Sequence, residues 1–114
     1  MTPGEIHDEM RRLSQSLDKA LTSLYEAGRE WAQAENDYRM ARAVAYLNSD
    51  GTVEARKSTT DLATSDERQR AHLADAMRQA ALEAVRSRRT QLSALQTVVN
   101  ALKAETELVT YGPQ

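Results

Sequence analysis

Residues 6–45 read IHDEMRRLSQSLDKALTSLYEAGREWAQAENDYRMARAVA, and one spacing runs through the whole stretch. Steps of four and three residues in alternation, starting from Ile6, reach only uncharged positions. One row of this heptad pattern holds the larger side chains, and the other is almost entirely alanine beyond Leu13. Such spacing over about six heptads is typical of a coiled-coil seam, in which the alanine row lets two helices approach closely. The seam residues are Ile6, Met10, Leu13, Leu17, Ala20, Leu24, Ala27, Trp31, Ala34, Tyr38, Ala41 and Ala45.

Helix-breaking residues are concentrated at the two ends of the chain and at residues 48–52, which read NSDGT. The two long segments between these places are rich in Ala, Leu, Arg, Glu and Gln, all strong helix formers. We therefore predict a helix over about residues 4–47, a turn at 48–52 and a second helix over about residues 53–109. A link this short favours an antiparallel pair. The expected fold is an all-α, coiled-coil-like helical hairpin that forms a single domain over residues 1–114.

The second predicted helix carries two competing signals. Its start is well defined, because Thr52 is a suitable N-cap and Glu54 suits the positive end of a helix. Further along, Ser and Thr accumulate between residues 58 and 66, and residues 64–67 (TSDE) match a capping box. The sequence therefore leaves two alternatives open: a continuous helix, or a kink and restart near residues 58–66.

The composition excludes several classes of protein. None of the 114 residues is Cys, so the chain can form neither a disulfide framework nor a thiolate metal site nor a cysteine nucleophile. The formal net charge of −2 excludes a uniformly basic nucleic-acid binder but leaves room for a local basic patch. No apolar run approaches the roughly 18 residues of a membrane span, and no leader sequence is evident. We therefore expect a cytoplasmic protein without a membrane partner.

The expected hairpin leaves apolar residues without partners. Closure at the turn would set side by side residues whose numbers sum to about 100, so that Leu62 would face Tyr38 and Trp31 would lie opposite residues 67–70. The stripe beyond about Leu95 would then face no helix, although burying each Leu or Val is worth about 1.5–3 kcal/mol. We therefore expect self-association, with a dimer of hairpins as the favoured oligomer and fraying of the last turns as the alternative. The residues expected to carry packing and assembly are Leu17, Leu24, Trp31, Tyr38, Leu92, Leu95, Val98, Val99 and Leu102.

Arginine outnumbers lysine twelve to three, and its guanidinium fork matches the geometry of phosphate groups. In the expected register, five arginines would share one level of the bundle and form a phosphate-contact patch for nucleic acid. Oppositely charged pairs at helical spacing, such as Glu83 with Arg86, favour the alternative of an ordinary solvated helix surface. No aromatic residue adjoins residues 86–89 to stack on bases. The candidate patch comprises Arg11, Arg12, Arg86, Arg88 and Arg89.

No residue pattern typical of catalysis or of cofactor binding is present in the sequence. The two histidines, His7 and His72, lack a second ligand at helical spacing, so no metal site is expected. Because there is no nucleophile elbow and no Gly-rich phosphate loop, we expect no cofactor, no small-molecule ligand and no enzymatic activity. One remote enzymatic alternative comes from Arg12 and Arg29, which resemble the paired arginines of all-helical chorismate mutases, with Arg39 where that family has a lysine.

Three segments carry a second resemblance: residues 31–39 (WAQAENDYR), residues 62–65 (LATS) and, above all, residues 80–96 (AALEAVRSRRTQLSALQ). Together with the ending YGP at residues 111–113, they resemble small helical proteins encoded by actinobacterial bacteriophages. The resemblance covers roughly residues 30–113. It implies a phage-encoded protein of the host cytoplasm, in a family with members among DNA-replication or recombination genes. It carries over no catalytic residue.

These observations lead to one main hypothesis and one alternative. The main hypothesis is a non-enzymatic coiled-coil accessory or scaffold protein that self-associates and contacts nucleic acid in phage DNA replication or recombination. The alternative is a protein-directed adaptor or inhibitor of a host protein, which docks the stretch beyond Leu95 in a groove. The sequence identifies no individual partner.

Overall fold

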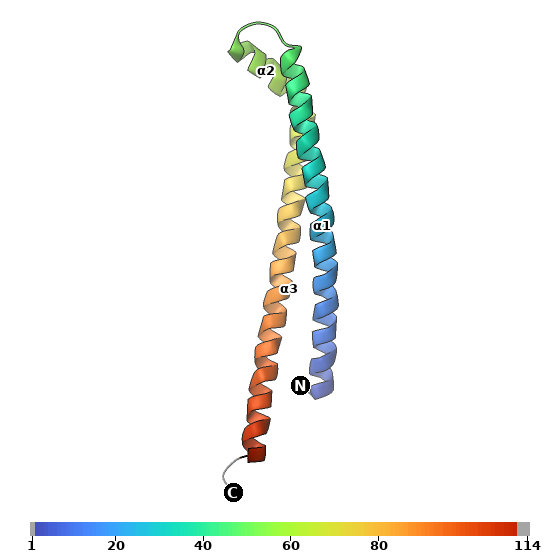
Figure 1. The fold of residues 1–114 in the computed structure, drawn as a ribbon, viewed down its shortest axis with the longest axis vertical. Coiled ribbons are helices and arrows are strands. Elements are labelled where there is room, and N and C mark those ends of the chain that lie inside the picture. Colours follow the sequence, from blue (N-terminus) through green and yellow to red (C-terminus); the bar gives the residue numbers. More distant parts are fainter. Residues whose placement is uncertain (1, 112–114) are drawn as a thin grey trace. The chain divides into compact units, whose positions relative to one another are not determined.

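A computed structural model describes residues 2–111 of the chain, with side chains described through residue 108 (Figure 1). Three helices follow one another, α1 (Pro3–Leu47), α2 (Val53–Ala63) and α3 (Ser65–Tyr111), and no strand occurs within those residues. The predicted all-α helical hairpin is thereby confirmed as the fold class. The first helix has nearly the predicted bounds, and the predicted turn separates α1 from α2.

Contacts between the helices divide the chain into two compact units. Unit 1 combines Met1–Thr22 with Glu83–Gln114, and unit 2 is the continuous stretch Ser23–Leu82. Each unit therefore contains a segment of α1 packed against a segment of α3, and unit 2 also contains α2.

The predicted seam of α1 is confirmed along its whole length. Every predicted position is buried or half-buried, from Ile6 and Leu13 in unit 1 to Ala34 in unit 2, which are 8%, 5% and 7% exposed. The positions between them are mostly exposed, because a heptad pattern directs one stripe of a helix toward its neighbour.

A matching seam runs along α3, and it contains three charged residues. Steps of four and three from Glu67 reach positions that are all buried or half-buried, including Ala71 at 2% exposed and Val85 at 1%. Arg78 and Arg88 belong to the same series, so charge interrupts the apolar pattern at three seam positions. The seam of α3 comprises Glu67, Ala71, Ala74, Arg78, Ala81, Val85, Arg88, Leu92, Leu95 and Val99.

The turn that closes unit 2 is held by local hydrogen bonds. Gly51 has a φ of 104°, which only glycine adopts readily, and Thr52 caps α2 by accepting a hydrogen bond from the backbone N of Ala55 at 3.2 Å. Arg56 donates to the carbonyl of Tyr46 at 2.8 Å, and its guanidinium carbon lies 4.1 Å from the centroid of the Tyr46 ring. These contacts link the start of α2 to the end of α1.

The second predicted helix is broken at Thr64, so the prediction of one continuous helix over residues 53–109 is wrong and the alternative of a break near residues 58–66 is correct. Thr64 has φ −114° and ψ 18°, outside the helical range. The predicted capping box does not form: the Thr64 backbone N–H and hydroxyl both donate to the carbonyl of Thr60, at 3.0 and 2.8 Å. The break separates α2, which is inclined to α1 in Figure 1, from α3.

The break also changes which residues of α1 and α3 face each other. Met10 and Val99 line one groove of unit 1, and Ala34 and Ala74 line one groove of unit 2, so facing residues have numbers that sum to about 108. The expected sum of about 100 is therefore wrong by about two helical turns. The reason is that α2 leaves the pair of long helices, so its residues do not pair with α1 in one continuous register. Leu62, which was expected to face Tyr38, is 80% exposed.

Candidate protein-interaction site

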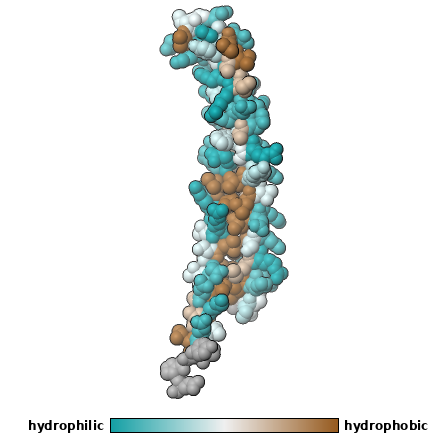
Figure 2. All heavy atoms as spheres, viewed as in Figure 1, coloured by the Kyte–Doolittle hydropathy of each residue, from teal (hydrophilic) through white to brown (hydrophobic). Residues whose placement is uncertain are grey.

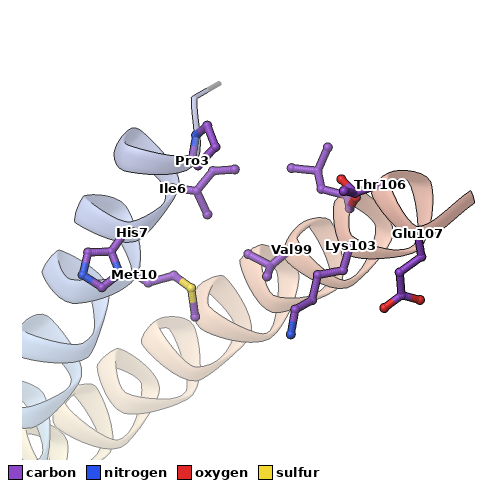
Figure 3. Close-up of a pocket in the computed structure, with 9 residues that line it drawn as sticks. Pro3, Ile6, His7, Met10, Val99, Lys103, Thr106 and Glu107 are labelled. Carbon is purple, nitrogen blue, oxygen red and sulfur yellow. The ribbon is translucent and has the colours of Figure 1, made fainter. Parts of the chain in front are cut away.

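Unit 1 contains an apolar groove between the first turns of α1 and the last turns of α3 (Figure 3). Its volume is about 470 Å³. Figure 3 shows Ile6 and Met10 extending from α1 toward Val99 on α3. Most of the lining is apolar, and the charged groups of Lys103 and Glu107 lie on the α3 side. The full lining is Pro3, Ile6, His7, Met10, Val99, Leu102, Lys103, Thr106 and Glu107.

This groove corrects the predicted overhang beyond Leu95. Val99 and Leu102 lie across from the first residues of α1, whereas the sequence had left them without a partner helix. The register accounts for this difference, because facing residues whose numbers sum to about 108 bring α1 opposite α3 as far as about Thr106. Leu108 is 72% exposed, and the side chain of Val109 lies outside the described residues.

Most of the residues expected to carry packing and assembly pack within the chain. Seven of them lie half-buried in the two seams, and the other two, Val98 and Leu102, are 47% and 40% exposed. An intrachain role does not test assembly itself, but it moves the candidate assembly surface to other residues. The seven seam residues are Leu17, Leu24, Trp31, Tyr38, Leu92, Leu95 and Val99.

Trp31 faces an arginine of the α3 seam. The guanidinium carbon of Arg78 lies 4.7 Å from the centroid of the Trp31 ring, within the range of a cation–π interaction. Arg78 also donates to Asp75 Oδ1 at 2.7 Å. The expectation that Trp31 lies opposite residues 67–70 is therefore wrong, and these contacts explain how α3 accommodates a charge in its seam.

The five arginines of the candidate phosphate patch do not share one level. Met10 lies across from Val99, so Arg11 and Arg12 lie at the level of residues of α3 that follow Arg89. Arg88 lies at a different level, where its Nε donates to Ser16 Oγ at 2.8 Å. The expectation of a five-arginine band is wrong because it depended on the register whose numbers sum to about 100.

Three of these arginines also have partners on their own helix. Arg11 is 3.0 Å from His7 Nε2, and Arg86 pairs with Glu83 at 2.7 Å. The Arg12 guanidinium hydrogen-bonds the Glu9 carboxylate, which holds the pKa of Glu9 below its ordinary value and raises the pKa of Arg12. These contacts correspond to the expected alternative of an ordinary charged helix surface.

Two basic residues in the last turns of α1 are also paired. Arg42 of α1 forms an ion pair with Asp61 of α2, and the hydrogen bond between them raises the pKa of Arg42. Arg39 pairs with Glu35 at 3.3 Å. Within residues 2–108, no group of three or more His, Cys, Asp or Glu side chains is arranged to hold a metal ion.

A second apolar groove lies in unit 2, between α1 and α3, with a volume of about 330 Å³. Its floor includes Ala34, which is 7% exposed, and Ala74. Leu73 and Met77 form part of its α3 wall and are 61% and 55% exposed. In Figure 2, apolar side chains reach the surface between hydrophilic flanks on the visible side of the molecule. Both Leu73 and Met77 lie outside the seam of α3.

The fold and these two grooves define a class: an all-α protein with exposed apolar grooves between its long helices. No protein-family model, no curated protein and no solved structure compared with the chain matches it. No helix in the part of the chain that the structure describes combines the length and apolar character that a membrane crossing requires.

Proposed function

We propose that this chain is a non-enzymatic scaffold or accessory protein that works by packing its helices against another copy of itself. One observation carries the proposal: large apolar side chains remain exposed outside the intrachain seams, foremost Leu73 and Met77 beside an apolar groove. The buried apolar core of the described residues is small, and two of its five members are alanines. It comprises Ile6, Leu13, Ala34, Ala71 and Val85.

Size-exclusion chromatography with light scattering tests the proposal on the full chain over a range of micromolar concentrations. We expect a mass of two chains at the upper end of the range, with dissociation on dilution. A mass of one chain at every concentration would show that the protein does not self-assemble and would refute the proposal.

A second candidate function, that of an adaptor or inhibitor for a host or phage protein, is favoured by the groove of unit 1. An apolar groove between two helices accepts side chains from one face of an amphipathic helix. The test is affinity capture with the wild type and with Leu102→Asp, which places a charge in the groove, and with Leu108→Asp as an exposed control on the same helix. A partner that both variants retain equally would exclude this groove as its binding site.

Contact with nucleic acid in phage DNA replication or recombination remains a third proposal. Its support is the resemblance carried by residues 80–96. The arginines of the candidate patch add no support, since they lie at separate levels of unit 1. Fluorescence anisotropy with labelled single- and double-stranded DNA at low salt tests it, with Arg86, Arg88 and Arg89 replaced by Ala. Affinity that is unchanged in the triple variant would exclude these arginines as the phosphate contacts.

A further inference from the structure

We infer that the groove of unit 2 flanked by Leu73 and Met77 is a homodimer interface, and that its occupant is the same groove of a second copy. This inference rests on the proposed self-assembly and names the surface that performs it. The Leu73 face, as we call this surface, comprises Glu30, Gln33, Ala34, Asp37, Arg70, Leu73, Ala74 and Met77.

The Leu73 face has the shape that helix packing requires. Leu73 and Met77 protrude from one wall, whereas Ala34 and Ala74 leave space between the walls. Protruding side chains from one copy can therefore enter the space above the alanines of the other, as knobs enter holes in helical bundles. Beyond the groove, Met40 and Val44 follow Asp37 at heptad spacing on α1 and are 61% and 54% exposed.

The charges on the two walls make the Leu73 face self-complementary. The α1 wall carries the acidic residues Glu30 and Asp37, and the α3 wall carries Arg70. Neither Arg70 nor Asp37 forms an ion pair in the described part of the chain, although Gln33 donates to Asp37 Oδ1 at 2.8 Å. In a dimer, Arg70 of one copy can therefore form an ion pair with Asp37 of the other copy.

These charges select one of two symmetric arrangements. A two-fold axis parallel to the helices sets α1 of each copy against α3 of the other, and it keeps residues of one level together. Arg70 and Asp37 lie at the same level of unit 2, so each Arg70 meets the Asp37 of the other copy. A two-fold axis across the helices would instead set the two acidic α1 walls against each other. The parallel axis also makes all neighbouring helices antiparallel, which is the usual geometry of a four-helix bundle.

The first experiment tests the apolar part of the interface by light scattering on the full chain. We expect Leu73→Glu and Met77→Glu each to weaken dimerisation by about a hundredfold, because the two-fold axis buries two copies of the new charge. Leu62→Glu serves as the control, because Leu62 also belongs to unit 2, is 80% exposed and lies outside the groove. Circular dichroism checks that all variants keep the helical content of the wild type.

The outcomes separate this inference from the proposed function. A wild type that is monomeric at every concentration refutes self-assembly and this inference together. A wild-type dimer that Leu73→Glu and Met77→Glu leave intact refutes only this inference, because assembly then uses another surface. A dimer that Leu62→Glu disrupts as strongly as Leu73→Glu also refutes it.

The second experiment tests the charge pairing by mixing two variants. Arg70→Glu alone and Asp37→Arg alone each set like charges together twice in a homodimer, and we expect dimerisation about tenfold weaker for each. In an equimolar mixture, the heterodimer contains two complementary pairs, so we expect dimerisation to recover to nearly the wild-type level. Because both chains keep their own mismatched charges, only contacts between chains can produce this recovery. A mixture that dimerises no better than its components would overturn the proposed pairing.

Discussion

Thr60 allows a direct test of how α2 packs in unit 2. Its side chain is 0% exposed, and its Oγ1 has no hydrogen-bond partner among the described residues. An unpaired buried hydroxyl costs about 1–3 kcal/mol, and burying one more methyl group gains about 0.8 kcal/mol. Thr60→Val keeps the shape of the side chain, and the two residues have similar helix propensities. We therefore expect the substitution to raise the free energy of unfolding by about 2 kcal/mol.

Urea unfolding followed by circular dichroism measures this change at a fixed protein concentration. We expect the midpoint to rise with an unchanged slope, since the substitution leaves the surface exposed on unfolding nearly the same. Thr59→Val is the matched control, because Thr59 is the preceding residue of α2, is exposed, and donates to the carbonyl of Ala55 at 3.0 Å. We expect a change near zero for it. If Thr60→Val lowers stability, the Thr60 hydroxyl has a buried partner and this account of the packing is wrong.

Three further predictions concern the seam, the turn and the surface charges. Val85→Ala should lower the free energy of unfolding by at least about 1 kcal/mol more than Val98→Ala, because Val85 is 1% exposed and Val98 is 47% exposed. Both substitutions gain the same helix propensity, so this term cancels in the comparison. Equal losses in urea unfolding would contradict the α3 seam. Gly51→Ala should cost about 1–2 kcal/mol in the same assay, because a φ of 104° is unfavourable for Ala, and an unchanged midpoint would contradict the turn geometry. Glu9→Gln should lower the free energy of unfolding at about pH 7, and this loss should shrink as the pH falls from there, because the pKa of Glu9 is depressed in the folded chain and the stabilisation it gives above the unfolded pKa is lost as the pH falls through the folded pKa. A stability difference that stays constant over this pH range would exclude the ion pair with Arg12 as its source.

The α1 seam could be predicted because nothing competes with the apolar pattern there. Every heptad position from Ile6 to Ala45 is uncharged, so the spacing alone indicates which stripe faces a neighbour. The α3 seam could not be found in this way, because Glu67, Arg78 and Arg88 occupy positions of the same stripe. Their place depends on contacts with α1, such as that of Arg78 with the Trp31 ring, which periodicity does not contain.

The expected pairing of α1 with α3 was wrong for one reason, the break at Thr64. The sequence held the signal, since residues 58–66 are rich in Ser and Thr, but the capping box within it does not form. Local propensity is a weak guide inside a long helical segment, where tertiary packing determines whether a chain continues or turns. Every expectation that depended on the register shifted with it. The five-arginine band, the neighbour of Trp31 and the overhang beyond Leu95 were all wrong for this one reason.

The distribution of side chains on α3 links the fold to the proposed dimer. A chain that packed only on itself would be more stable with leucine or methionine in its seam and arginine outside it. Burying an apolar side chain stabilises the fold, whereas burying a charge destabilises it. In α3 this order is reversed: Arg78 lies in the seam, whereas Met77, which directly precedes it, and Leu73, one helical turn before Met77, are more than half exposed. Exchanging the apolar side chains with the arginine would bury the apolar surface within the chain. No exposed apolar surface would then remain for a second copy to bind. The proposed dimer across the Leu73 face would bury Leu73 and Met77, which the chain alone leaves exposed.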